Sequence, residues 1–347
     1  MKRILILGSN IIGLYNAMKY YETDFVIDII DKKCNMHLDT VDNYIYNLYN
    51  DNHKSYINLL KKFNITSIPL SIKYNERIYN IINIVIEKVK LLPYNVYLSY
   101  SFIDLCKCIL TNTDYDILNK ELNYSNILNC INAYDFINIF TNDLSKKINY
   151  YYITNDNINL LITKMINHLT SNKNIKIYYN LKCQKLDFNY DTNIFLFNNN
   201  EYDYVVCTFS KKNIIELNIW NTKQKNLLNN SVYNINLYNI KNFIDILINI
   251  NVYTNLIENK TNINNILLNQ LQVVYPQNNY KIRFISLWNI NINSNTYFKD
   301  KNKEKIKFLF NNKLFISNLC YCKNNLFINY VLDDIDCTSF IKLKKKK

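Results

Sequence analysis

The chain has 347 residues, enough for one large or two ordinary domains, and its formal net charge is +13. Such a charge suggests nucleic acid as a partner, but asparagine, isoleucine, lysine and tyrosine dominate throughout, as an AT-rich genome would impose. Nucleic-acid binding stays open only if the lysines cluster on one folded face. No apolar run reaches membrane-spanning length and the first residues enter a strand at once, so we expect no membrane partner and a cytoplasmic protein, in host cytoplasm or virion if the genome is viral.

The chain contains only two glycines, where average usage would give about twenty-four. Both lie in the run Gly8-Ser9-Asn10-Ile11-Ile12-Gly13, which follows an apolar segment, Lys2 to Leu7, and precedes a helical pattern, Leu14 to Tyr21. A composition that has lost glycine elsewhere keeps it at the two corners of a strand-to-helix turn. The segment therefore predicts the opening of a dinucleotide-binding βαβ unit.

A second apolar strand, Phe25 to Ile30, ends in Asp31, about twenty residues after the glycine turn. An acidic residue at this distance is the expected acceptor for a ribose hydroxyl, and the helix N-terminus offers N–H groups to a pyrophosphate. The predicted cofactor-binding residues of this unit are Gly8, Ser9, Asn10, Ile12, Gly13, Asp31 and Lys32.

One position departs from the dinucleotide-binding pattern. Asn10 stands where the motif has its second glycine, at the point of closest approach between backbone and pyrophosphate. Asparagine tolerates left-handed backbone angles, but its Cβ and amide occupy space that the phosphate would need. The alternative is an ordinary parallel αβ unit that binds no nucleotide.

The rest of the chain predicts alternating helices and strands. His37, His53 and His168 are scattered, and Cys106 and Cys108 lie in an apolar segment without zinc-site spacing, so we expect buried thiols and no metal site. The expected helices are 52–63, 102–110, 125–139 and 157–169; the expected strands are 78–86, 175–179, 202–208, 314–316 and 326–332; and a hairpin of 182–189 with 192–197 precedes a turn at 198–201.

Three segments in the second half carry a resemblance to a family. They are Ile177-Tyr178-Tyr179-Asn180, then Cys183, then Asp203-Tyr204-Val205-Val206-Cys207-Thr208. Together with the glycine turn, they resemble the two nucleotide-domain segments of the flavin-containing amine oxidases and related FAD oxidoreductases. The resemblance implies FAD as cofactor, the backbone of Cys183 facing the adenine, and Lys241 as the lysine near the flavin.

The resemblance also implies a fold and a division of the chain. The fold is α/β, an FAD/NAD(P)-binding Rossmann-type parallel sheet with a second, α+β substrate-like domain. The expected parts are 1–65 and 151–215 for the FAD-binding-like domain, 66–150 and 216–310 for the substrate-like domain, and 311–347 for a C-terminal segment with a basic tail.

Two family features are missing from the sequence. The family has a glycine pair and an arginine where this chain reads His37-Leu38-Asp39, and its closing glycine-rich segment has no counterpart, because no glycine follows Gly13. Two hypotheses follow. The protein is a divergent FAD-dependent oxidoreductase that oxidises an amine or similar CH–X substrate by hydride transfer to flavin, or it is a catalytically inactive member of that fold with a structural or interaction role, in a virus for example.

Overall fold

The computed structural model of the protein has a six-stranded sheet at its centre, with strand order β13-β14-β10-β1-β2-β6. The residues described are 1–31, 48–70, 76–121, 133–143, 148–181, 185–208, 214, 216–222, 224–225, 237–240, 243–246, 308–317 and 330–337. The strands of the sheet are β1 (Arg3–Leu7), β2 (Val26–Ile30), β6 (Ile175–Tyr178), β10 (Tyr204–Cys207), β13 (Phe308–Leu309) and β14 (Leu314–Ile316).

All neighbouring strands from β14 to β6 are parallel, and only the short edge strand β13 is antiparallel. In β1, Ile4 pairs with Ile27 of β2 on one side and with Tyr204 of β10 on the other. Strand order therefore reverses at β1: the chain passes from β1 to β2 and β6 on one side, then returns to β10 and β14 on the other. This arrangement is a Rossmann-type sheet, so the predicted fold class is confirmed.

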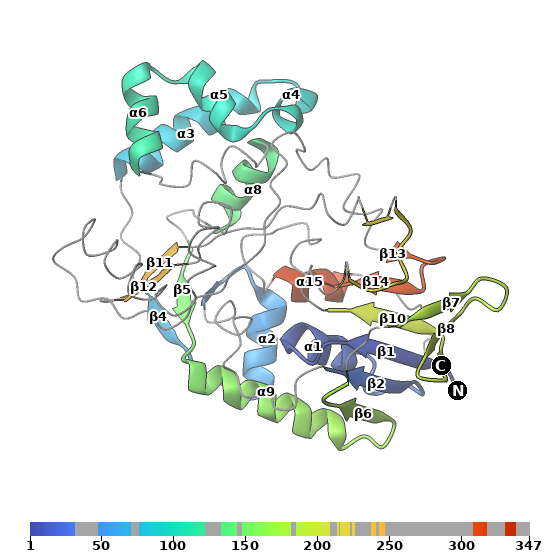
Figure 1. Ribbon diagram of the computed structural model, residues 1–347. Coiled ribbons are helices and arrows are strands. Elements are labelled where there is room, and N and C mark those ends of the chain that lie inside the picture. The colour runs from blue at the N-terminus through green and yellow to red at the C-terminus, as the bar shows by residue number, and fades with distance from the viewer. Residues whose placement is uncertain are drawn as a thin grey trace, which may run out of the picture.

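Alternate residues of each strand enter different cores, as the two-residue repeat of a strand requires. Ile4 and Ile6 of β1 lie in a core with four helices, whereas Leu5 and Leu7 face the opposite side. Figure 1 shows the helices α1, α2, α9 and α15 grouped beside the sheet. Their bounds are α1 (Ile11–Lys19), α2 (Lys54–Lys62), α9 (Asn155–Thr170) and α15 (Tyr330–Cys337).

A three-stranded antiparallel sheet covers the other face and connects β6 to β10. Its strands are β7 (Asp187–Asn189), β8 (Ile194–Phe197) and β9 (Asn200–Tyr202). The sequence predicted a two-strand hairpin followed by a turn over 198–201. That prediction was wrong in part, because the loop is only Asn198 and Asn199, both with positive φ, and the chain then pairs again as β9.

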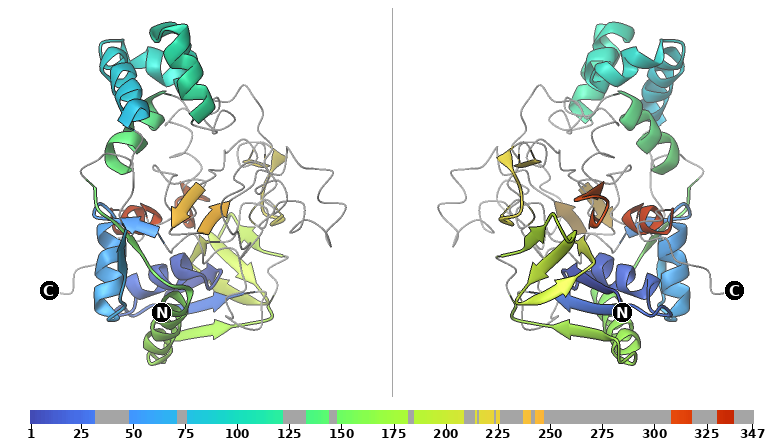
Figure 2. Two further views of the ribbon diagram at one scale, coloured as in Figure 1. Left: turned by 90° about the vertical axis from the view of Figure 1, so that its left-hand side faces the viewer. Right: turned by 90° about the vertical axis from the view of Figure 1, so that its right-hand side faces the viewer.

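A separate helical unit lies away from the sheet, at the top of Figure 1, and has its own apolar core. Its helices are α3 (Glu76–Lys90), α4 (Tyr94–Ser99), α5 (Phe102–Ile109), α6 (Asn112–Glu121) and α8 (Ala133–Asp143). A small sheet of β3 (Leu48–Asn50), β5 (Tyr150–Tyr152) and β4 (Ile68–Leu70) lies in the chain segments that enter and leave this unit, and both views of Figure 2 place the helices on the far side of it from the main sheet.

One predicted strand is a helix in the structure, and so is the described end of a second, residues 330–332 of 326–332. The run 78–86 belongs to α3, whose buried residues recur at helical spacing, so its many isoleucines misled a prediction based on β-branched composition. Residues 330–332 open α15, which packs on α1 and α2 after β14. The chain after β14 thus contributes a helix to the core beside α1 and α2, in a segment without glycine.

Several smaller expectations can be compared with the structure. Cys106 is buried as predicted, but Cys108 is exposed, because it lies on the opposite side of α5 from the core. The strands β11 (Leu237–Ile240) and β12 (Phe243–Ile246) form a separate two-stranded antiparallel sheet. Among the helices in the described ranges, none is long and apolar enough to cross a membrane. The proposed domain boundaries stay predictions.

Candidate functional site

The turn between β1 and α1 is built around its two glycines. Gly8 has φ of 112°, a backbone conformation that residues with a side chain rarely adopt. At Gly13, a Cβ would lie 1.9 Å from the carbonyl oxygen of Gly8 and 3.1 Å from Oγ1 of Thr208. The first glycine therefore allows the turn, and the second allows helix α1 to begin directly against it.

Asn10 is the N-cap of α1 and makes two hydrogen bonds with its side-chain amide. Its Oδ1 accepts from the backbone N–H of Gly13 at 2.9 Å, and its Nδ2 donates to the carbonyl oxygen of Thr208 at 2.9 Å. Its backbone is extended, with φ of −67° and ψ of 173°. The left-handed tolerance of asparagine is thus not needed at this position, and the N-cap preference of asparagine explains the residue instead.

Asp31 lies at the end of β2 and faces the same turn. Its Oδ2 accepts from the backbone N–H of Ser9 at 2.9 Å and from Oγ of Ser9 at 2.8 Å. The N–H of Gly8 also donates to the carbonyl oxygen of Ile30, so the turn is bonded to β2 through both backbone and side chain. A carboxylate close to the positive end of a helix dipole is electrostatically favourable here.

The turn occupies the position where open α/β sheets bind their ligands. Strand order reverses between β1 and β10, and the carboxyl ends of these strands carry Gly8 and Thr208. Thr208 donates from Oγ1 to the carbonyl oxygen of Leu7 at 2.9 Å, which holds the two strand ends together. Ligands of doubly wound sheets lie in the crevice beyond the carboxyl ends at this switch point.

The end of β6 extends the site beyond Asp31. The N–H of Asp31 donates to Tyr178 and the N–H of Leu181 donates to Asp31, both through backbone carbonyls at 2.9 Å. Between them, Tyr179 is partly buried, and burial together with the charge of Asp31 raises the pKa of its phenol. The chain turns sharply at Asn180, whose φ is 58°. The structure thus places an aromatic side chain beside the acidic residue that the sequence assigned to ribose.

The structure brings six of the predicted site residues together and leaves three outside its described part. Gly8, Ser9, Asn10, Gly13 and Asp31 are joined by the contacts above. Ile12 follows in the first turn of α1, but its side chain is buried in the core, so only its backbone faces the turn. The predicted residues Lys32, Cys183 and Lys241 fall outside the described residues.

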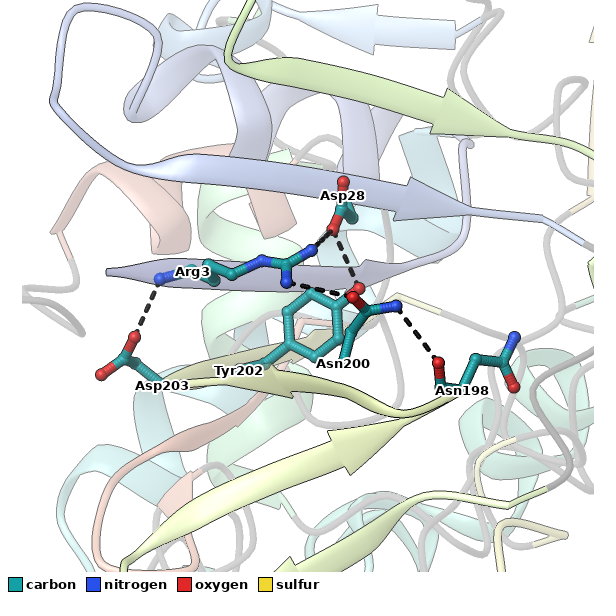
Figure 3. Close-up of polar contacts among 6 residues, drawn as sticks. All are labelled: Arg3, Asp28, Asn198, Asn200, Tyr202 and Asp203. Carbon is teal, nitrogen blue, oxygen red and sulfur yellow. Dashed lines mark hydrogen bonds and ion pairs between the residues drawn. The ribbon is translucent and has the colours of Figure 1, made fainter. Parts of the chain in front are cut away.

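A buried polar cluster at the opposite end of β1 escaped the sequence analysis (Figure 3). Arg3 donates from Nη2 to Oδ2 of Asp28 at 2.6 Å, and Tyr202 donates to the same oxygen at 2.9 Å. The guanidinium also lies over the ring of Tyr202 and donates to the side chain of Asn200. The backbone N–H of Arg3 donates to the carboxylate of Asp203. The signal in the sequence was an aspartate within the apolar strand Val26–Ile30.

This Arg3–Asp28–Tyr202 cluster has a structural role. It fastens β9 to the start of β1 and the middle of β2. Because Asp28 is only 2% exposed, its charge needs Arg3 as a partner. Burial and the bond to Asp28 raise the pKa of Tyr202, which keeps its phenol protonated as the donor. The cluster therefore holds the three-stranded sheet of β7, β8 and β9 against the main sheet.

The described residues offer little for nucleophilic or metal chemistry. His53 is buried and its Nδ1 accepts from the N–H of Asn50 at 3.2 Å. His168 stacks on Tyr21, and partial burial and the charge of Lys62 lower its pKa. Within the described ranges, no group of three metal-ligating side chains occurs.

The comparisons with known proteins identify no family for this chain. No protein-family model matches it, and no curated protein matches it. Similar solved structures include an oxidoreductase from Methanosarcina mazei (8% identity, TM-score 0.46) and a protein from Pyrococcus furiosus (12% identity, TM-score 0.43). The matches cover 67% and 65% of this chain, and the chain spans 66% and 64% of theirs, just under two thirds.

Proposed function

We propose that the protein is a divergent FAD-dependent oxidoreductase, which oxidises an amine or a similar CH–X substrate by hydride transfer to the flavin. The observation that carries the proposal is the meeting of the glycine turn and Asp31 at the switch point of the parallel sheet. This position and these residue types match the pattern that is typical of dinucleotide sites, which supports the proposal. The antiparallel sheet between β6 and β10 is compatible with the same assignment.

The residues present fit the adenosine half of the cofactor. Asp31 would accept hydrogen bonds from the ribose, and Tyr179 beside it would provide an aromatic face. The backbone of Gly8 and Ile12 would face the pyrophosphate at the helix N-terminus. A bound flavin supplies the hydride-accepting chemistry. We also retain Lys32 and Cys183 as further cofactor contacts and Lys241 as the catalytic candidate.

A second candidate function has one observation in its favour. Asn10 places a side-chain amide at the point where the pyrophosphate of a dinucleotide approaches the backbone. A protein that had given up its cofactor could keep this internal bond in place of the ligand. The alternative is therefore an inactive flavoenzyme fold with a structural or interaction role.

The test is a visible absorption spectrum of the purified full-length protein, before and after addition of FAD and removal of the excess. We expect the bands of a bound, oxidised flavin. Asp31→Ala should lose the flavin while staying folded by circular dichroism, because the ribose loses its acceptor. The matched control Asp191→Asn changes an exposed aspartate in the β7–β8 loop and should retain the flavin. A folded wild-type protein that ignores FAD would overturn the oxidoreductase proposal and favour the alternative.

A further inference from the structure

Asn10 connects the first turn of helix α1 to the end of strand β10. Its carboxamide lies across the ends of β1 and β10, with one atom bonded to helix α1 through Gly13 and the other to the carbonyl of Thr208. We propose that Asn10 is a latch on the glycine turn, so that its side chain must rotate out before a pyrophosphate can bind there. The proposal rests on the proposed function, because it concerns the same dinucleotide.

The latch occupies one of the backbone donors that an anion would use, and a second is bonded to Asp31. The first N–H groups of a helix have no partner within the helix, and this is why helix N-termini bind phosphates. Here the N–H of Gly13 is bonded to Oδ1 of Asn10, and the N–H of Ser9, just before the helix, is bonded to Asp31. Two backbone donors on either side of the N-cap thus have partners from this chain's own side chains.

The second bond makes the side chain more than an ordinary N-cap. An N-cap side chain needs only an acceptor, and the side-chain oxygen of serine, threonine or aspartate could accept the bond from Gly13 as well. Among these side chains, only the amide of asparagine has a donor atom separate from its acceptor atom, and Nδ2 of Asn10 donates to the carbonyl oxygen of Thr208, a residue 198 positions away in the sequence. The side chain is therefore fixed at both ends and cannot leave the turn without breaking two hydrogen bonds.

The backbone at Asn10 does not require this residue. With φ of −67° and ψ of 173° it is extended, a conformation open to glycine and alanine as well. Substitutions at this position can therefore remove the carboxamide without a change of backbone angles. Asn10→Ala removes the carboxamide and keeps Cβ, whereas Asn10→Gly removes both.

The experiment is a titration of the full-length wild type, Asn10→Ala and Asn10→Gly with FAD and with ADP, followed by fluorescence and calorimetry. Both variants should bind about tenfold more tightly than wild type, equivalent to about 1.4 kcal/mol, because the binding-competent turn no longer has to be opened. Asn10→Asp should bind more weakly than wild type, because it keeps the cap and adds a negative charge. Without ligand, Asn10→Ala should melt at a lower temperature than wild type, since the cap and the bond to Thr208 are lost.

A matched control separates the latch from a general effect of losing an asparagine. The side chain of Asn189 likewise makes two hydrogen bonds to the backbone, since its Oδ1 accepts from the N–H groups of Asp191 and Thr192 in the exposed β7–β8 turn. Asn189→Gly should leave the affinity for FAD and ADP at the wild-type value.

The possible results distinguish the latch from the proposed function. Wild-type binding of FAD with no gain in either variant would overturn the latch and leave the function standing. A gain in Asn10→Gly but not in Asn10→Ala would place the obstacle at Cβ and would also overturn it. Binding by the variants but not by wild type would support the latch, but it would overturn the oxidoreductase proposal for the wild-type protein and favour the inactive alternative. If none of the folded proteins binds FAD or ADP, both proposals fail.

Discussion

At the scale of single residues, asparagine replaces glycine in several backbone roles. The described residues with positive φ include Asn64, Asn180, Asn193, Asn198 and Asn199, and asparagine is the residue other than glycine that most readily adopts such angles. Glycine remains at two positions, Gly8, whose φ of 112° other residues rarely adopt, and Gly13, where a Cβ would lie 1.9 Å from the carbonyl oxygen of Gly8. This division explains why the two glycines were so informative in the sequence.

The pairing of Arg3 with Asp28 leads to a prediction for stability. Arg3→Met should lower the free energy of unfolding by about 2 kcal/mol, because the charge of Asp28 is left buried without its partner. This is below the cost for fully buried pairs, since the Arg3 side chain is 32% exposed and water screens part of the interaction. Denaturant unfolding of the purified variant measures the change.

A double variant and a control identify the cause of that loss. Arg3→Met combined with Asp28→Asn should regain much of the stability, because the charge is gone and Tyr202 keeps an acceptor. Lys185→Met breaks an exposed pair with Asp187 and should change stability by less than about 0.5 kcal/mol. If the double variant were as unstable as Arg3→Met, packing of the arginine stem would be the cause instead of charge.

At the scale of elements, the sequence predicted the parallel strands best. The strands β1, β2, β6 and β10 were all located within a residue or two, because β1, β2 and β10 are short apolar runs buried on both faces and β6 carries two isoleucines in a short run after a helix. The helix α3 was missed, because isoleucine and valine supply its whole buried face and those residues also favour strands. In a chain this rich in isoleucine, composition is a weaker guide than spacing.

The hairpin of β8 and β9 provides a prediction at this scale. Phe197 pairs with Asn200, which leaves a two-residue loop, Asn198 and Asn199, whose positive φ values of 47° and 61° match the type I′ turn of tight hairpins. Asn199→Ala should lower the free energy of unfolding by about 1 kcal/mol, because alanine has no support for a left-handed conformation. Asn199→Gly should stay within about 0.5 kcal/mol of wild type, because glycine adopts the angle freely.

Thermal and denaturant unfolding of both variants would measure this effect, with Glu201→Ala on the exposed side of β9 as the control. Equal stability of Asn199→Ala and Asn199→Gly would mean that the loop conformation is not set by these angles.

At the scale of the whole molecule, the candidate site is held together by long-range contacts, and the sequence alone could predict only some of them. Gly8, Gly13 and Asp31 could be assigned because the motif places them within one βαβ unit. The partner of Asn10 could not, because Thr208 reaches the turn only through the parallel pairing of β10 with β1. The Arg3–Asp28–Tyr202 cluster has the same origin, since β9 and β1 are brought together only by the fold. Sequence spacing thus predicted the local motif, and topology determined its partners.

The tyrosines of the molecule predict its response to alkaline pH. Burial raises the pKa of Tyr56 well above 10.0, and burial with a bond to Asp336 or Asp28 raises the pKa of Tyr15 and of Tyr202. An acid whose pKa is higher in the folded state holds its proton there after the unfolded chain has lost it. The stability that these groups contribute is therefore complete below pH 10 and falls as pH rises above it, by up to about 1.36 kcal/mol per pH unit for each tyrosine.

Urea unfolding at a series of pH values should show this decline in the free energy of unfolding. Tyr202→Phe should reduce the slope of the decline by the share of one tyrosine. The control Tyr190→Phe, on an exposed turn, should keep the wild-type slope. A wild-type slope in Tyr202→Phe would mean that its phenol ionises as easily in the folded protein as in the unfolded chain.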